Sequence, residues 1–196
     1  MFNKFSKPNK TIGKKNIVFG FIYLALTAVL GVVMVEMYQD YGKAVQEKQA
    51  AVGRLQTLKE NSFEEELEPL NAKQIAQANT DGILALNKLT NTEIGIDSIK
   101  GGPHAHGNLE ALLNIAVGIV LSFLAVNVML KQAISWLFIL GTLLHSGMLY
   151  LERVFDLPWA GTILGTGVGP IMILAGLVLT GIVAIKGFNG EVVYDN

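Results

Sequence analysis

The chain has 196 residues, a net charge of −1 and no cysteine. The lack of cysteine excludes disulfides, thiolate metal sites, iron–sulfur clusters and covalently attached c-type heme, so histidine and carboxylate are the strong metal ligands that remain. Hydrophobic residues make up 51% of the chain and its charges form no basic stripe, so we expect a membrane protein that does not bind nucleic acid.

The apolar residues are concentrated in four blocks. A hydrocarbon core of about 30 Å needs about 20 helical residues, and lipid does not tolerate irregular backbone, so each block predicts one transmembrane helix. The fold class we expect is an all-α integral membrane protein with four such helices. A small helical segment outside the cytoplasm should join the first two. The predicted transmembrane helices cover residues 16–37, 108–130, 133–152 and 160–185.

Charge predicts the orientation of these helices. Residues 1–15 carry five lysines and no acidic residue, which places this end in the cytoplasm by the positive-inside rule. Four crossings return the tail, residues 186–196, to the same side. The first block leaves through VEMYQD, without a small-residue cleavage site, so it predicts an uncleaved anchor rather than a signal peptide. We therefore expect a multi-pass protein of a bacterial inner membrane with both termini in the cytoplasm.

The segment 38–103 is predicted to be folded and to lie outside the cytoplasm. Apolar residues at three- and four-residue spacing from Tyr38 onward predict that the first helix continues beyond the membrane. Ser62 and Glu65 have the spacing of a capping box, which predicts the start of another helix. The segment is either a helical cap on the bundle or, over residues 40–103, a docking surface for a periplasmic partner.

Counting along the helices predicts how deep the histidines lie. The second and third helices should form a hairpin that turns near Lys131 and Gln132. At about 1.5 Å per residue, His106 would then lie about 38 Å and His145 about 20 Å from the turn. Two side chains together reach across only about 13 Å, so the count predicts two separate sites rather than one bis-histidine heme.

His145 is the first candidate site. The same count places Gly118 and Gly169 at its height, with Pro170 directly after Gly169. One interpretation is structural: the glycines permit close helix packing and His145 donates to Thr142 or to a backbone carbonyl. The other is functional: the glycines leave room beside His145 for a porphyrin or quinone ring, because ionisable residues inside a membrane often mark a site.

The second candidate site lies where the second helix begins. His106 and Glu110 are one turn apart and share a helix face, and the count places Glu152 opposite them. One interpretation is an ion pair between Glu110 and Arg153. The alternative is a copper, zinc or iron site in which His106 and Glu110 are ligands and His104 or Glu152 completes the set.

The stretch AHGNLEALLNIAVGIVL resembles the second-helix heme-ligand segment of the catalytic subunits of heme-copper oxidases and nitric-oxide reductases. In those subunits a histidine shortly before an asparagine opens an apolar, glycine-containing helix. His106 and Asn108 are the matching positions, within residues 104–120. The resemblance implies a b-type heme and a distant four-helix relative, whereas those subunits have many more helices and more ligand histidines.

These patterns predict an accessory subunit of a larger respiratory or other redox membrane complex. No catalytic constellation is complete, so we do not expect the chain to be an enzyme on its own. Its partners would be other integral membrane subunits and lipid. Two alternatives stay open: a heme- or quinone-binding redox subunit, and a metal-binding or metal-delivery protein with a His/Glu site at the outer face.

Overall fold

The computed structural model describes residues 11–195, so residues 1–10 of the predicted basic N-terminus and Asn196 lie outside the described residues. The chain divides into two compact units. The first contains Met1–Leu30 and Gly101–Asn196, and the second contains Gly31–Lys100. We call the first the bundle unit and the second the hairpin unit.

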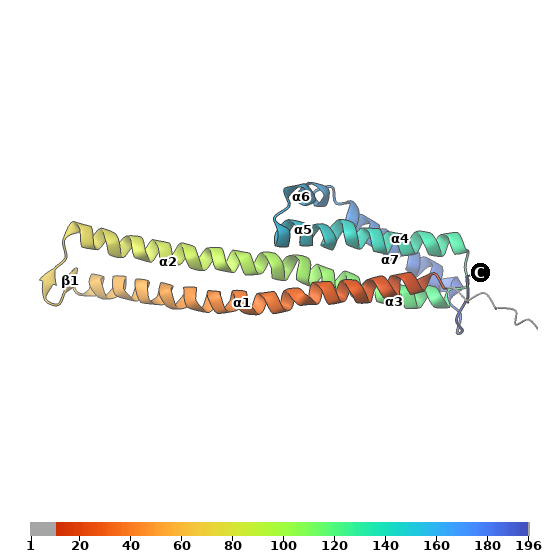
Figure 1. Cartoon of the computed structure of the whole chain (residues 1–196), viewed down its shortest axis with the longest axis horizontal. Helices are drawn as coiled ribbons and strands as arrows, with labels where there is room; N and C mark the ends of the chain where they lie inside the picture. Colours follow the sequence, from red (N-terminus) through yellow and green to blue (C-terminus); the bar gives the residue numbers. More distant parts are fainter. Residues whose placement is uncertain (1–10, 196) are drawn as a thin grey trace, which may run out of the picture. The chain divides into compact units, whose positions relative to one another are not determined.

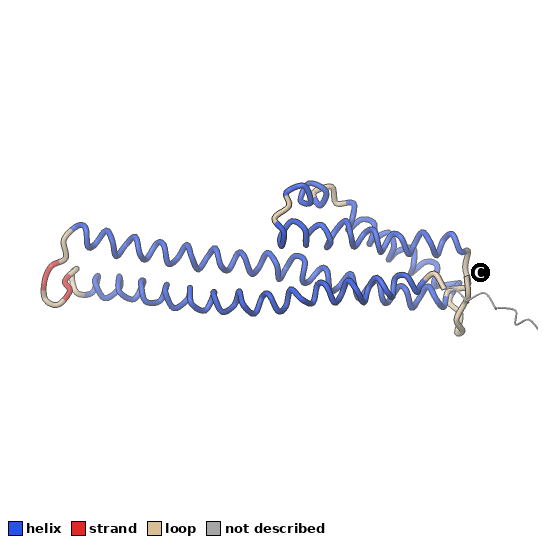
Figure 2. The backbone as a smooth tube through the Cα atoms, viewed as in Figure 1, coloured by secondary structure: helices blue, strands red, loops and turns tan. Residues whose placement is uncertain are grey.

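Four helices of the described chain are long and apolar enough to cross a membrane, in agreement with the four predicted blocks (Figure 1). The first is α1, and the last is α7. The second is kinked at Gly102, within the segment labelled η1. The third contains one π-helical turn, η2, and a short helix, α6, precedes α7. Apart from two short strands the chain is helical almost throughout (Figure 2). The bounds are α1 Gly13–Glu60, α2 Ala72–Ile99, η1 Lys100–His104, α3 Ala105–Phe123, α4 Val128–Thr142, η2 Leu143–Gly147, α5 Met148–Phe155, α6 Pro158–Leu164 and α7 Val168–Gly187.

Glycines bring the helices of the bundle unit into close contact. A side chain on Gly20 of α1 would collide with the backbone of Ala111 on α3, and Gly118 of α3 packs directly against the start of α1. On α4, Gly141 packs in the same way against Ile173 of α7. Small residues allow helix backbones to approach closely, which is the usual source of helix association in lipid. The outward faces of α1 and α7 carry exposed large apolar residues, which suit contact with lipid.

The turn between α3 and α4 differs from the predicted one. The helix expected over 108–130 ends at Phe123, and residues 124–127 turn the chain before α4 begins at Val128. Asn127 caps α4, because its side chain accepts a hydrogen bond from the backbone N–H of Met129. Hydropathy alone hides this turn, since residues 124–126 are as apolar as the helices around them. Lys131 consequently lies within α4 rather than in the turn.

The helix expected over 160–185 is also interrupted. Residues Pro158–Leu164 form the separate short helix α6, which packs on α5. The chain then bends at Gly165–Gly167, where Gly167 has a φ of +69°. That left-handed conformation is readily available to glycine and ends the helical run. The membrane-length helix is therefore α7 alone.

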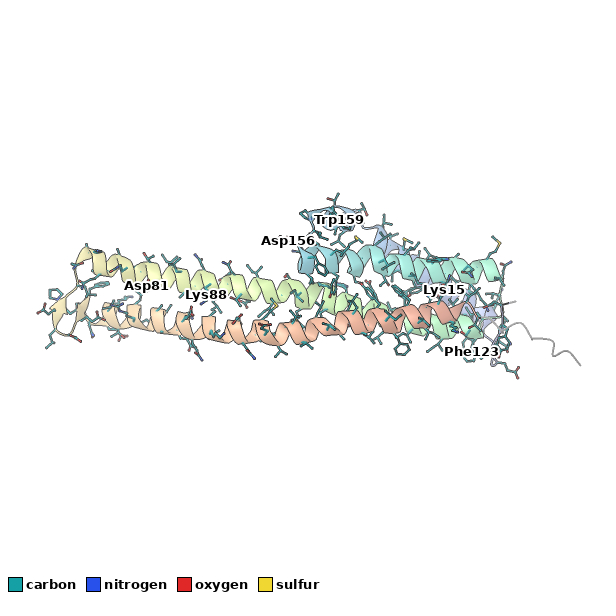
Figure 3. All side chains as sticks on the ribbon, in the orientation of Figure 1. Lys15, Asp81, Lys88, Phe123, Asp156 and Trp159 are labelled. Carbon is teal, nitrogen blue, oxygen red and sulfur yellow. The ribbon has the colours of Figure 1, made fainter. Side chains whose placement is uncertain are left out.

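The hairpin unit is an antiparallel pair made by α2 and the C-terminal part of α1. Successive contacts join Met37 with Gly95, Glu47 with Lys88, and Leu55 with Gly82. Lys88 lies on the side of α2 that faces α1 (Figure 3), where its Nζ is 2.7 Å from Glu47. The continuation of the first helix beyond its apolar block is thus confirmed.

The tip of the hairpin unit corrects another expectation. Ser62 does not start a helix: its φ is +57°, whereas an N-cap residue needs extended backbone. Instead, β1, Glu64–Glu65, pairs antiparallel with β2, Glu68–Pro69. The capping box is formed further along, where the side chain of Asn71 accepts from the backbone N–H of Gln74 and the side chain of Gln74 accepts from that of Asn71.

Candidate metal centre

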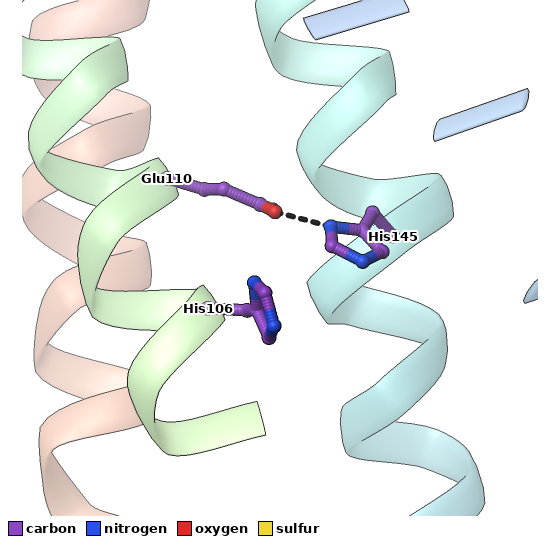
Figure 4. Close-up of side chains that lie close together, drawn as sticks. All are labelled: His106, Glu110 and His145. Atoms are coloured by element: carbon purple, nitrogen blue, oxygen red, sulfur yellow. Dashed lines mark hydrogen bonds and ion pairs between the residues drawn. The ribbon is translucent and has the colours of Figure 1, made fainter. Parts of the chain in front are cut away.

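Three ligating side chains of the bundle unit come together between two helices. His106 and Glu110 lie on α3, and His145 lies in η2 (Figure 4). One ligand atom from each residue lies within 4.8 Å of the others. The two imidazole rings are in edge contact, with centroids 4.8 Å apart and planes inclined by 65°. We call these three residues the His–Glu triad.

Glu110 is the buried centre of the triad, with its side chain only 4% exposed. Its Oε1 lies 2.5 Å from Nδ1 of His145, and its Oε2 accepts a hydrogen bond of 2.5 Å from the hydroxyl of Ser146. Both carboxylate oxygens therefore have a partner. A carboxylate buried without such partners would be costly in a low-dielectric interior, so these contacts explain why Glu110 can lie inside the bundle.

The π-helical turn η2 supplies both partners of Glu110. His145 and Ser146 are consecutive in the sequence, and the wider π-helical turn presents both side chains to α3. Such single π-turns inside an α-helix occur frequently at functional sites. Ser146 also lies 2.9 Å from the hydroxyl of the buried Tyr23 on α1, so a third helix helps to fix the carboxylate.

A second set of buried polar residues lies along the bundle beside the triad. Asn114 donates to Thr142 Oγ1 and to the backbone carbonyl of Glu110, and its Oδ1 accepts from Asn16. Asn16 in turn accepts a hydrogen bond from the hydroxyl of Ser135. These four residues, Asn16, Asn114, Ser135 and Thr142, join α1, α3 and α4, and we call them the amide network. Interhelical hydrogen bonds of this kind hold membrane helices together.

The predicted separation of His106 from His145 is wrong, and the misplaced turn is the reason. His106 lies 17 residues before Phe123, where α3 ends, and His145 lies 17 residues after Val128, where α4 begins. At equal rise per residue the two histidines are therefore level. Counting from Lys131 makes α3 too long and α4 too short, and this produces the false offset.

His104 and Glu152 do not join the triad. Nδ1 of His104 lies 3.2 Å from the backbone carbonyl of Thr27, on the side of α1. Glu152 packs against Gly161, and its Oε2 lies 3.4 Å from Nε of the adjacent Arg153. The predicted ion pair between Glu110 and Arg153 is wrong, since the carboxylate of Glu110 contacts His145 and Ser146 instead.

The two glycines predicted to border His145 have different surroundings. A side chain on Gly169 would come within 2.6 Å of the backbone nitrogen of His145, so Gly169 does pack against that residue. Gly118 packs against Gly13 and Ile17 of α1 instead, and its predicted place beside His145 is wrong. Both glycines contact helix backbone, which leaves no space there for a porphyrin or quinone ring.

The sequence pattern did not predict that His145 and Ser146 are the partners of Glu110. The sequence shows Glu110 with a histidine one turn before it. Which residue of the next helix faces this pair depends on where the turn between α3 and α4 lies.

Comparison of the chain with protein-family models, with curated proteins and with solved structures gave no match, so the chemistry of the site must come from its own residues.

Proposed function

We propose that this chain is a multi-pass membrane protein that binds one divalent transition-metal ion at His106, Glu110 and His145. The observation that supports this is the convergence of two imidazoles and one carboxylate, from two helices, within 4.8 Å. Two histidines with one carboxylate are a ligand set that Zn²⁺ and non-heme Fe²⁺ use. The lack of cysteine removes the competing thiolate chemistry.

The charges of the triad suit such an ion. Neutral imidazoles and one carboxylate offset one unit of a doubly charged cation. Three protein ligands, or two if Glu110 only orients His145, leave at least one coordination position open. His106 is exposed while Glu110 is buried, so an ion would arrive from the side of His106. An open position and an entry path are what distinguish a reactive or exchanging metal site from a closed structural one.

Two coordination modes agree with the geometry. In the first, Oε1 of Glu110 binds the ion directly and gives up its hydrogen bond to His145. In the second, Glu110 keeps Nδ1 of His145 and orients the ring, so that His145 binds through Nε2. A carboxylate that accepts from a ligating histidine is a common arrangement around metals. In both modes Ser146 holds the second oxygen of Glu110.

A single ion suits the two histidines better than a bis-histidine heme. With metal–nitrogen bonds of about 2 Å on opposite faces of an iron, the two ring centres would lie about 6 Å apart. The rings of His106 and His145 are closer than that and inclined to one another. The resemblance of residues 104–120 to a heme-ligand helix, and the role as a subunit of a redox complex, stay predictions.

The test is metal analysis of the full chain purified in detergent and loaded with Zn²⁺ or, under reducing conditions, Fe²⁺. We expect about one bound ion per chain, and its loss in His106→Ala and in His145→Ala. His104→Ala is the matched control, because His104 lies only two residues before His106 but contacts Thr27, and it should keep the ion. Background metal in the unaltered chain would refute the proposal, as would a heme absorption band that depends on both histidines.

A further inference from the structure

At the other end of the bundle unit, the segment after α7 lies across the turn between α3 and α4. The backbone N–H of Asn189 donates to the carbonyl of Phe123, and that of Val193 donates to the carbonyl of Ser122. Phe188 forms a bridge with Leu124. We call residues 188–195 the strap. Figure 1 marks this end of the chain beside the start of α1.

The strap ends in a buried ion pair. Oδ1 of Asp195 lies 2.6 Å from Nζ of Lys131, whose side chain is 0% exposed. Oδ2 of Asp195 accepts a hydrogen bond of 2.9 Å from the backbone N–H of Ile12, directly before α1 begins. One carboxylate is thus held by a buried ammonium group and by a backbone donor at a helix N-terminus.

These donors also suit other oxyanions. An ammonium group supplies a point charge without directional demands, and the N-terminus of a helix favours negative charge. Among the described residues, three more lysines lie at this end of the bundle unit, Lys14 and Lys15 at the start of α1 and Lys186 in the last turn of α7. The surroundings therefore favour an anion that carries more charge than a carboxylate, such as a phosphate.

The backbone contacts that hold the strap to the turn are the hydrogen bonds from Asn189 and Val193 and the bridge at Phe188. The strap has no helix or strand of its own beyond the bridge at Phe188, and the side chains of Phe188, Val192 and Tyr194 are exposed. If Asp195 leaves, Lys131 loses its counter-ion, so an anion that takes the place of Asp195 favours release of the strap. Departure of the strap and arrival of another anion are therefore coupled.

We propose that Lys131 and the N–H of Ile12 form a phosphate-binding site which Asp195 fills as an intramolecular ligand, and that the phosphate of an anionic lipid displaces the strap. The site lies at the end of helices that are long enough to cross a membrane, where headgroups are found. Inorganic phosphate carries the same chemistry and is the alternative source of the ligand.

A spin label on the strap tests the proposal, since the chain has no cysteine of its own. Tyr194→Cys places the label on an exposed position next to Asp195. In the full chain reconstituted into vesicles, label mobility should rise with the fraction of phosphatidylglycerol and stay low in pure phosphatidylcholine. Inorganic phosphate added to phosphatidylcholine vesicles is the third arm, and release there would assign the site to the free anion.

Two further variants keep the result interpretable. Asp195→Asn leaves Lys131 in place but weakens its present ligand, so the phosphatidylglycerol fraction needed for half-release should fall. A disulfide between Ser122→Cys and Val193→Cys should fix the strap and abolish the response of a label at position 194. In that variant the label is attached through a ketone-bearing residue, so that no third cysteine competes. The proposal is overturned if mobility is the same in all three arms, or if Asp195→Asn leaves the half-release point unchanged.

Discussion

Nδ1 of His145 lies 2.5 Å from Oε1 of Glu110, which joins η2 to α3 through the only carboxylate that is buried within the described part of those two helices. This contact makes the burial of Glu110 and the orientation of the His145 ring depend on each other. The imidazole gives the carboxylate a partner inside the bundle, and the carboxylate fixes which ring nitrogen of His145 faces away from it. Metal affinity and helix packing should therefore both respond to changes around this contact.

Ser146→Ala should weaken metal binding without removing a ligand. The hydroxyl of Ser146 donates to Oε2 of Glu110, and its loss frees the carboxylate to rotate. Loss of an outer partner of this kind typically lowers metal affinity about 10- to 100-fold. A Zn²⁺ competition titration measures the change. Ser122→Ala is the control, because the hydroxyl of Ser122 bonds to a carbonyl of its own helix, and its affinity should be unaltered.

Glu110→Gln should separate the two coordination modes. If Glu110 binds the ion, a neutral amide in its place should abolish stoichiometric binding. If Glu110 only orients His145, the amide oxygen can still accept from Nδ1, and affinity should fall about 10- to 100-fold instead. The readout is the same Zn²⁺ titration. Unchanged affinity would exclude both modes and with them the role of Glu110.

Gly169→Ala should destabilise the bundle unit and disturb the metal site together. The added methyl group would lie 2.6 Å from the backbone nitrogen of His145, which forces η2 and α7 apart. Overpacking of this kind costs about 1–3 kcal/mol. Thermal unfolding in detergent gives the loss of stability. Gly181→Ala on the same helix is the control, since nothing lies within 4 Å of its would-be side chain and stability should hold.

Asn114→Leu should be among the more harmful single changes in the amide network. It removes one of the two acceptors of the Asn16 side-chain amide, leaving only the carbonyl of Ser135, and it removes the donor to Thr142. A buried polar group left without a partner costs about 1–3 kcal/mol. The loss should appear as a lower unfolding temperature. Asn91→Leu, at an exposed position of α2, should change it little, and equal effects would mean that the network is not stabilising.

The orientation of the helices is tested by labelling. Single cysteines at Gln77 and at Asn189, both exposed positions, should react with an impermeant thiol reagent from opposite faces of the membrane. The lysines near the N-terminus motivate this expectation, because they favour the cytoplasmic side. Reaction of both positions from the same face would contradict the predicted crossing number or the predicted placement of residues 38–103.

Hydropathy was enough to find the four membrane-length helices, and one-turn spacing was enough to pair His106 with Glu110. Neither signal was enough to identify His145 as the third ligand. The turn at residues 124–127 has an apolar sequence, and its one polar signal is the cap at Asn127. If the turn is placed a few residues too late, the distance from the turn is wrong for every residue of α4 and η2. The count from the sequence therefore separated His106 from His145, whose rings are in contact.

The capping boxes show the same limit on a smaller scale. Ser62 with Glu65 and Asn71 with Gln74 have identical spacing, yet only the second pair caps a helix. The difference lies in the residues C-terminal to each pair. Residues after Asn71 continue with helical periodicity, whereas those after Ser62 fold back through Glu66 and Leu67, both at positive φ. A local motif is informative only when its continuation agrees with it.

The amide network separates two charged regions of the bundle unit. Glu110 of α3 and His145 of η2 lie on one side of the network, and Lys131 with Asp195 lies on the other. Asparagine side chains have no proton that they can readily gain or lose, and both amides are engaged in hydrogen bonds. The network therefore adds no titratable group between these two charged regions. Groups that stay neutral at physiological pH therefore lie between the carboxylate of Glu110 and the ammonium group of Lys131.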